Sequence, residues 1–322
     1  MMDKRAKIYV ADNDGLIGRA ILAELEREGY EHVLPAPKDG PTLTEAAEVD
    51  EYFVRCQPSY VFLVGGKTGG IKANQSFPAV LMRDNLLVNC HVIESAFRHG
   101  VKKLLYLASS CVYPKLSDQP MKVQYLMTGK LEPTNEPYAT AKLAGLLLCQ
   151  AYRRQFKKPF ITAIPSNVFG PGDDFSLEDS HVVGALMRRM HEAKTRGQAH
   201  IDVWGSGLPR REFIFSRDLA RACLFLMDAY DGDEPVNVGV GSDWSIREIA
   251  EMIREAVGYN GELKFDRSKP DGMPAKLLDS SHLKQMGWMP QTSMRAALAI
   301  TYEWFLQHRS DAEGKQDGRA VL

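Results

Sequence analysis

The chain has 322 residues, 25% of them charged, and a formal net charge of −1, so no excess positive charge favours nucleic acid or an anionic membrane. Its five cysteines lack CxxC spacing, and their odd number argues against a disulfide framework or a zinc site. The charged start, MMDKRAKIYVADND, differs from a signal peptide, and no apolar run is long enough to cross a bilayer. We expect a cytoplasmic protein with no nucleic-acid partner, no membrane partner and no bound metal.

Strand and helix patterns alternate through the first half of the chain. An apolar strand pattern at 7–11 precedes a helix pattern at 16–29. The same order recurs in the strand patterns 60–66, 102–110 and 159–165 and the helix patterns 78–100 and 136–156. This repetition predicts an α/β fold with a Rossmann-like, doubly wound parallel sheet.

After Pro165 the loops become longer and more polar, which predicts a smaller C-terminal substrate-binding domain on the sheet edge where such folds bind ligands. Its predicted elements are a strand at 201–205 and helices at 180–194, 245–257 and 293–307. The predicted divisions are a Rossmann domain of 1–165 with 213–240 returning to it, a substrate domain of 166–212 and 241–309, and a disordered tail of 310–322.

The turn between the first strand and helix reads VADNDGLIG, where a dinucleotide-binding fold holds its pyrophosphate. Gly15 and Gly18 stand at the second and third glycine positions of such a turn, whereas Asp12 replaces the first glycine. Aspartate tolerates a left-handed backbone, so we expect the turn to survive. Asp14 adds a second carboxylate, and like charges about 5 Å apart at an effective dielectric of ~20 repel by roughly 3 kcal/mol.

Tyr138 and Lys142 are four residues apart at the start of a predicted helix and therefore share one face. We expect the ammonium to lower the pKa of the phenol, so that Tyr138 exchanges a proton with a carbonyl while a nicotinamide delivers hydride. Alone, this YxxxK spacing equally describes a surface pair. Ser109 at the end of the strand 102–110 can hydrogen-bond the same carbonyl, and the three residues match the triad of short-chain dehydrogenases and reductases.

Cys111 follows Ser109 by two residues, and His181 precedes a helix pattern. A single cysteine after a strand is more often a small buried apolar residue. A single histidine at a helix start is more often a surface group or a neighbour of the cap. Their candidacy as functional residues depends on the similarity described next.

Several stretches resemble the GDP-L-fucose synthase family: SSCVYPKLSDQPMKVQYLMTGKLEPTNEPYATAKLAG, GGIKANQSFPAVLMRDNL, NVFGPGDDFSLEDSHVVGALMRRMHEAK, VWGSGLPRREF and SKPDGMPAKLLD. The similarity extends over nearly the whole chain, to about His308. It implies an enzyme that epimerises C3 and C5 of GDP-4-keto-6-deoxy-D-mannose and then reduces the C4 ketone with NADPH.

The resemblance also implies a role for each catalytic candidate. The C4 ketone acidifies the protons on its two neighbouring carbons, so a base and an acid on opposite faces can invert these carbons. The resemblance makes Cys111 the base and His181 the acid. Ser109 and Tyr138 stabilise the enolate oxygen and then assist reduction, while Lys142 holds the nicotinamide ribose. The candidate cofactor-binding residues are Asp12, Gly15, Leu16, Ile17, Gly18, Lys38, Lys142, Asn167 and Val168.

For the GDP group the resemblance implies Arg189, Trp204, Arg211 and, more weakly, Lys276. Two arginines near a tryptophan suit a diphosphate and the plane of a base. Without the resemblance, Arg189 equally fits a solvated helix face. Family members often carry arginine where this chain has Ala275, which leaves room for a changed substrate.

The family also carries arginines after its second strand that suit the 2′-phosphate of NADPH, whereas HVLPAPKDGP here retains only Lys38. The resemblance implies NADP as the cofactor, and the missing arginines make NAD the alternative. Two functional alternatives stay open: a related epimerase or reductase for a different keto-sugar, and an impaired nucleotide-sugar-binding protein. By analogy with short-chain reductases, the apolar helices at 78–97 and 142–156 predict a homodimer.

Overall fold

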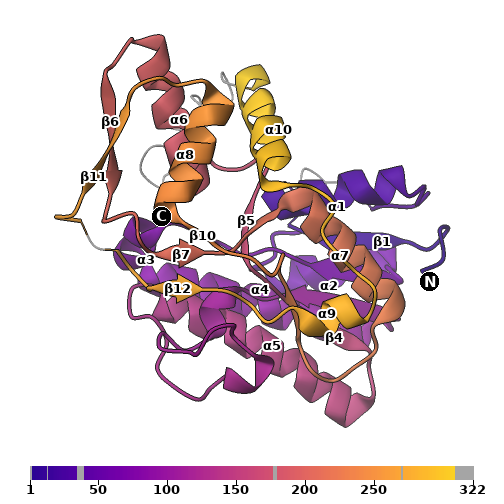
Figure 1. The fold of residues 1–322 in the computed structure, drawn as a ribbon. Coiled ribbons are helices and arrows are strands. Elements are labelled where there is room, and N and C mark those ends of the chain that lie inside the picture. Colours follow the sequence, from indigo (N-terminus) through magenta and orange to yellow (C-terminus); the bar gives the residue numbers. More distant parts are fainter. Residues whose placement is uncertain (1, 13, 35–39, 177–179, 270, 309–322) are drawn as a thin grey trace.

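The computed structural model describes residues 2–12, 14–34, 40–176, 180–269 and 271–308 (Figure 1). Its central sheet has the order β1-β2-β3-β4-β9, and all neighbouring strands run parallel. The strands are β1 (Ile8–Ala11), β2 (Tyr60–Leu63), β3 (Lys103–Leu107), β4 (Phe160–Pro165) and β9 (Val236–Val238). Ile8 of β1 also forms a parallel β-bridge with Val33, so β1 has hydrogen-bonded neighbours on both sides, β2 on one and Val33 on the other. The predicted parallel sheet is confirmed, and ligands of such sheets bind at the carboxyl ends of the strands.

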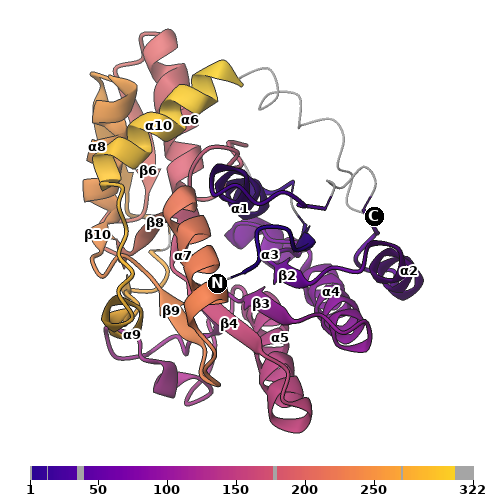
Figure 2. The same ribbon diagram turned by 90° about the vertical axis from the view of Figure 1, so that its right-hand side faces the viewer.

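Helices cover both faces of this sheet, which explains why its strands are mostly apolar (Figure 2). One face carries α1 (Leu16–Arg27) and α7 (Ser216–Ala229), and the other carries α2 (Ala46–Cys56), α4 (Pro78–Arg98) and α5 (Glu136–Phe156). Successive residues of β1 enter different cores, because Ile8 and Val10 pack on the α1 side whereas Tyr9 and Ala11 pack on the α4 side.

The chain enters a second lobe after β4 and again after β9. Its core lies among α6 (Val182–Thr195), α8 (Ile246–Val257) and α10 (Met294–Gln307). Its strands are the parallel pairs β6 (His200–Trp204) with β11 (Glu262–Asp266) and β5 (Asn167–Phe169) with β8 (Phe213–Phe215), and the set β10 (Trp244–Ser245), β7 (Arg210–Arg211) and β12 (Ala275–Lys276). The short helices among the described residues are η2 (Ser110–Val112), η3 (Val123–Tyr125), α3 (Ile71–Ser76) and α9 (Ser281–Gln285).

The helices predicted from periodicity are confirmed, and their ends have local causes. The predicted helix 136–156 coincides with α5, which begins at Glu136 and ends at Phe156. Helix α8 begins at a capping box between Ser245 and Glu248 and ends at Gly258, whose φ of 67° suits glycine. Sequence reasoning missed α2 and α7. The expected disordered tail of 310–322 lies outside the described residues.

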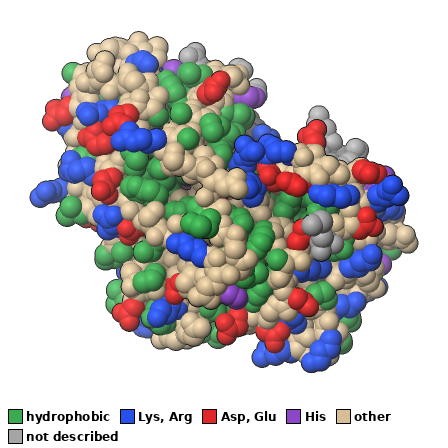
Figure 3. All heavy atoms as spheres, turned by 45° about the vertical axis from the view of Figure 1, so that its right-hand side comes forward, with side chains coloured by type: hydrophobic (Ala, Val, Ile, Leu, Met, Phe, Trp, Pro, Cys, Tyr) green, Lys and Arg blue, Asp and Glu red, His purple; other side chains and the backbone are tan. Residues whose placement is uncertain are grey.

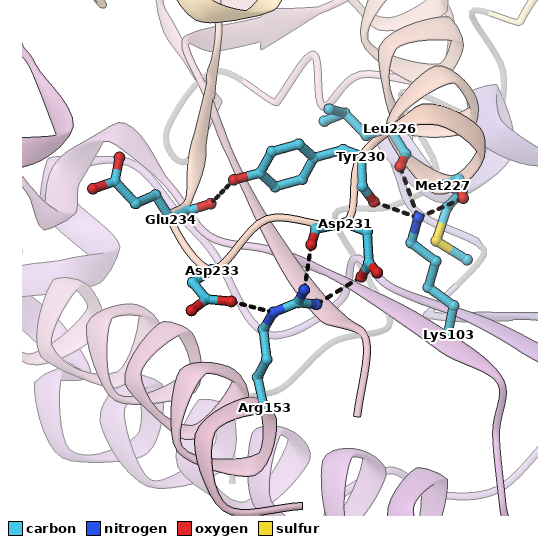
Figure 4. A network of polar contacts seen from close by, with 8 residues as sticks. All are labelled: Lys103, Arg153, Leu226, Met227, Tyr230, Asp231, Asp233 and Glu234. Atoms are coloured by element: carbon cyan, nitrogen blue, oxygen red, sulfur yellow. Dashed lines mark hydrogen bonds and ion pairs between the residues drawn. The ribbon is translucent and has the colours of Figure 1, made fainter. Parts of the chain in front are cut away.

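Two cations fasten the carboxyl end of α7 to the rest of the first lobe (Figure 4). Lys103 of β3 donates to three carbonyl oxygens, those of Leu226, Met227 and Tyr230, at 3.1, 2.6 and 2.5 Å. Arg153 of α5 reaches the carboxylates of Asp231 and Asp233 at 2.8 and 2.6 Å. Positive charge at a helix carboxyl end stabilises the helix, so the connection from α7 into β9 is held from two elements.

Charge of both signs is spread over the face seen in Figure 3, where Lys and Arg side chains alternate with Asp and Glu. No helix among the described residues is long and apolar enough to cross a membrane.

Candidate active site

The amino end of α1 presents backbone N–H donors to an anion. Gly15 is its N-cap and makes no side-chain cap, the first turn holds no acidic residue, and a Cβ on Gly15 would meet no atom within 4 Å. The first backbone N–H groups of a helix lack intrahelical partners and bind phosphate well. The predicted residues Leu16, Ile17 and Gly18 form this first turn. These features fit the pyrophosphate of a dinucleotide.

Asp12 takes up the left-handed conformation that its sequence position requires. Its φ is 65°, and its Oδ2 accepts a hydrogen bond from the Gly66 N–H at 3.0 Å. A Cβ on Gly65 would lie only 2.0 Å from the Asp12 Cβ, so glycine after β2 makes room for the aspartate. Asp12 therefore adopts the left-handed backbone that we expected it to tolerate. Burial raises the Asp12 pKa, and a hydrogen bond with Asp14 raises it further, while the Gly66 bond and Lys142 lower it.

The Ser109, Tyr138 and Lys142 triad gathers at the carboxyl ends of β2 and β3. Ser109 caps η2 just after β3, and Tyr138 lies near the hydroxyl groups of Ser109 and Thr68, which lower its pKa. The Lys142 Nζ donates to the carbonyl oxygens of Gly65 and Leu107 at 2.9 and 3.3 Å. Helix α5 therefore brings the phenol and the ammonium to one edge of the sheet, as the YxxxK spacing predicts.

One electrostatic expectation for the triad is wrong. We expected Lys142 to lower the pKa of Tyr138, but burial and the neighbouring Cys111 raise it, against hydrogen bonds from Thr68 and Ser109. Lys142 directs its ammonium to backbone carbonyls instead. Burial lowers the pKa of Lys142 to about 8, while Cys111 and Asp12 act in the opposite direction. Removal from water therefore outweighs the local charges at both groups.

Cys111, His181 and Lys276 influence one another across the two lobes. Cys111 is buried in η2, and burial raises the pKa of its thiol, with Lys276 the largest opposing influence. His181 is the N-cap of α6 and its surface is exposed, yet the protein around the ring desolvates it and lowers its pKa. Asp174 raises the His181 pKa, and Lys276 lowers it further. Lys276 thus favours a thiolate at Cys111 and a neutral ring at His181.

The residues expected to bind GDP lie on neighbouring elements of the second lobe. Arg211 and Lys276 are register partners on β7 and β12. The Arg189 guanidinium, from α6, donates to the Asp202 carbonyl of β6 at 2.9 Å, and Trp204 ends that strand with 64% of its surface exposed. The Lys269 Nζ lies 5.5 Å from the Trp204 ring centroid. An exposed indole beside cations is suited to stacking on a base.

Glu212 was not predicted from the sequence, although it forms hydrogen bonds with several segments around the site. Its carboxylate is fully buried and accepts hydrogen bonds from the N–H groups of Gly241 and Leu278 at 2.7 and 2.9 Å. Its carbonyl accepts from the backbone and side-chain nitrogens of Asn167 at 3.2 and 3.0 Å. Burial raises the Glu212 pKa to about 7. A glutamate within the apolar run REFIF was the available signal.

The other predicted positions add less. Val168 packs at the border of the first core, next to Asn167. Lys38, the candidate partner for a 2′-phosphate, lies outside the described residues. Thr68 gave no sequence signal, because a single polar residue in a glycine-rich loop has many roles. The described residues contain no group of three or more His, Cys, Asp or Glu side chains that could hold a metal ion.

A Rossmann-type sheet with a Ser-Tyr-Lys triad at its carboxyl edge defines a class of nicotinamide-dependent enzymes, and the chain belongs to the NAD dependent epimerase/dehydratase family, which matches residues 8–239. Within that class it is a member of the GDP-L-fucose synthase family. GDP-L-fucose synthase 1 of Arabidopsis thaliana is 49% identical over 308 residues, covering 96% of this chain and 95% of the relative. GDP-L-fucose synthase of Escherichia coli K12 is 41% identical, covering 96% and 99%.

A solved structure gives the same result. The GDP-L-fucose synthetase of Naegleria fowleri bound to NADP superposes with a TM-score of 0.88 at 29% identity. The superposition covers 96% of this chain and 97% of the other.

Proposed function

We propose that the protein converts GDP-4-keto-6-deoxy-D-mannose to GDP-L-fucose by epimerising C3 and C5 and reducing the C4 ketone with NADPH. The observation that carries the proposal is the joint presence of a reduction triad and an acid–base pair, because Cys111 lies beside both Ser109 and Tyr138. The names of the curated relatives support the substrate, and the NADP-bound relative supports the cofactor.

In the epimerisation step, the Cys111 thiolate removes a proton from the carbon next to the ketone, and His181 returns a proton to the opposite face. Ser109 and Tyr138 donate hydrogen bonds to the C4 oxygen, where the negative charge of the enolate develops. Lys276 stabilises the thiolate. Burial raises the Cys111 pKa and lowers the His181 pKa, so the thiolate and the imidazolium are both minor forms at neutral pH. A rise in pH increases the thiolate and decreases the imidazolium, so the rate of epimerisation falls at both extremes of pH.

In the reduction step, Tyr138 gives its phenolic proton to the C4 oxygen. The reduced nicotinamide supplies the hydride to C4 when it is bound. The high pKa of Tyr138 keeps the phenol protonated before the transfer. Lys142 holds the nicotinamide ribose, and Asn167 and Val168 border the ring. Backbone N–H groups of Gly15 to Gly18 bind the pyrophosphate, with Lys38 proposed for the 2′-phosphate.

The second lobe binds the nucleotide in this proposal. The positive charges of Arg211, Lys276 and Arg189 bind the diphosphate, and Trp204 stacks on guanine. The proposal retains the domain division into 1–165 with 213–240, and 166–212 with 241–309. We also propose that the protein is cytoplasmic and pairs as a homodimer through α4 and α5. Leu143 and Leu147 of α5, which line a groove together with Val123 and Leu126, supply apolar surface on the α5 side of this pairing.

The test is the loss of reduced-nicotinamide absorbance when the protein meets GDP-4-keto-6-deoxy-D-mannose, with NADPH and NADH in parallel. Consumption of NADPH with formation of GDP-L-fucose supports the proposal. Binding of the GDP-sugar without consumption of either nucleotide would refute it and favour the impaired binding protein.

A second candidate function is a related reaction on a different GDP-linked keto-sugar. It is favoured by Ala275, which precedes Lys276 on β12 and faces Arg210 in the register, where the family often carries arginine. A panel of GDP-linked 4-keto sugars separates the two, because the true substrate gives the highest kcat/KM.

A further inference from the structure

Asp12 and Lys142 meet at the two glycines that follow β2. The Asp12 carboxylate accepts from the Gly66 N–H at 3.0 Å, and the Lys142 Nζ donates to the Gly65 carbonyl at 2.9 Å. These two groups belong to the same peptide unit, so the carboxylate and the ammonium hold it from its two ends. A Cβ built on Gly66 would lie 3.7 Å from the Lys142 Nζ, which shows how closely the lysine approaches this segment.

We propose that Asp12 is a positioning residue for the reaction, since its carboxylate supplies the counter-charge of Lys142 and fixes the peptide to which Lys142 binds. The catalytic part of this inference rests on the proposed function. The structural part depends only on the contacts among Asp12, Gly65, Gly66 and Lys142.

The groups that face Lys142 leave Asp12 as its main negative neighbour. Cys111 approaches from η2, but burial raises its pKa and keeps the thiol neutral near pH 7. The Tyr106 ring of β3 lies 5.4 Å from the Lys142 Nζ and carries no charge. Tyr138, on the lysine's own helix, is protonated because burial raises its pKa.

Asp12 in turn faces Asp14 of the same turn and Tyr9 of β1. Asp14 raises the Asp12 pKa, whereas the Gly66 N–H and Lys142 lower it, so the cation favours the charged form of Asp12. Burial raises the pKa of Tyr9, which is therefore neutral. The carboxylate that the sequence alone marks as an obstacle to the cofactor phosphate is turned towards the Gly65–Gly66 peptide, which Lys142 also contacts.

The test uses Asp12→Asn, which keeps an oxygen to accept from Gly66 and tolerates a left-handed backbone, but removes the charge. The readout is the 13C resonance of the Lys142 Cε in the protein without ligands, assigned by its loss in Lys142→Arg and followed between pH 6 and 11. We expect an inflection near pH 8 in the wild type and one about one pH unit lower in Asp12→Asn.

Asp14→Asn is the matched control, since it removes a carboxylate from the same turn but frees Asp12 to ionise fully. Its Lys142 inflection should equal that of the wild type or lie higher. The inference is overturned if Asp12→Asn leaves the inflection within 0.3 pH unit of the wild type, or if both variants lower it equally. Asp12→Gly replaces Asp12→Asn if that variant does not fold, and it should lower the inflection similarly.

A second readout connects the charge to catalysis. The alkaline limb of NADPH oxidation should move to lower pH in Asp12→Asn by the same interval as the lysine resonance. An unmoved limb with a shifted resonance overturns the catalytic part alone. If the wild type reduces no GDP-sugar, the proposed function fails, whereas the lysine titration still decides whether Asp12 is the counter-charge.

Discussion

Gly65→Ala tests whether the Asp12 side chain can be accommodated after β2 only when residue 65 has no Cβ. The new Cβ would lie 2.0 Å from the Asp12 Cβ and 2.7 Å from its Oδ2. The Asp12 Cβ cannot move away independently, because it is attached to a backbone held at a φ of 65°. Forced overpacking of this kind costs about 1–3 kcal/mol.

The matched variant is Asp12→Gly, which removes the three side-chain atoms that the new Cβ would meet. Alone, it loses the acceptor of the Gly66 N–H, which costs roughly 0.5–1.5 kcal/mol. Combined with Gly65→Ala, it abolishes the clash. The double variant should therefore be more stable than the sum of the single effects predicts, with a coupling energy of about 0.5–3 kcal/mol.

Urea unfolding followed by far-UV circular dichroism gives the free energy of unfolding of all four proteins. The reasoning would be refuted if Gly65→Ala stayed within about 0.5 kcal/mol of the wild type, the scatter of ordinary surface substitutions. Strict additivity of the two single substitutions would refute it equally.

Three further predictions follow from the site. Tyr138→Phe should reduce NADPH consumption by at least about 10²-fold, while deuterium from D2O still enters C3 and C5 of the sugar. Cys111→Ser should instead slow this deuterium entry, which mass spectrometry of the sugar nucleotide measures in both variants. Full reductive turnover by Tyr138→Phe would contradict the assignment of the triad. Glu212→Gln should flatten the pH dependence of the free energy of unfolding between pH 4.5 and about 7. Folding raises the Glu212 pKa, so the wild type loses stability as the pH rises through that window. The same pH dependence of the urea midpoint in both proteins would contradict this. Ser245→Ala should cost about 1 kcal/mol by removing the capping box of α8, and an unchanged urea midpoint would contradict it.

Periodicity and spacing predicted the parts of the molecule that local sequence determines. The strands of the first half and the helix α5 follow from apolar patterns, and the YxxxK spacing places Tyr138 and Lys142 on one helix. The carboxyl-edge rule of parallel sheets then brings Ser109 to them.

The remaining features depend on contacts between distant segments. The pKa of Tyr138 is set by burial, which no spacing along α5 reveals. The fit of Asp12 depends on glycines more than 50 residues away, and the acceptor role of Glu212 depends on amides from the segments after β9 and β12. Charge counting along the sequence cannot reveal where the Asp12 carboxylate points, because that direction is a tertiary property.

The contact between Asp12 and Gly65 also restricts the order in which this turn can change by mutation. A chain with alanine at 65 has no space for the aspartate, so the loss of that side chain must precede or accompany the appearance of Asp12. In the reverse direction, glycine must return at 12 before any side chain can return at 65. The two positions should therefore vary together among related sequences, with aspartate at the first accompanied by glycine at the second.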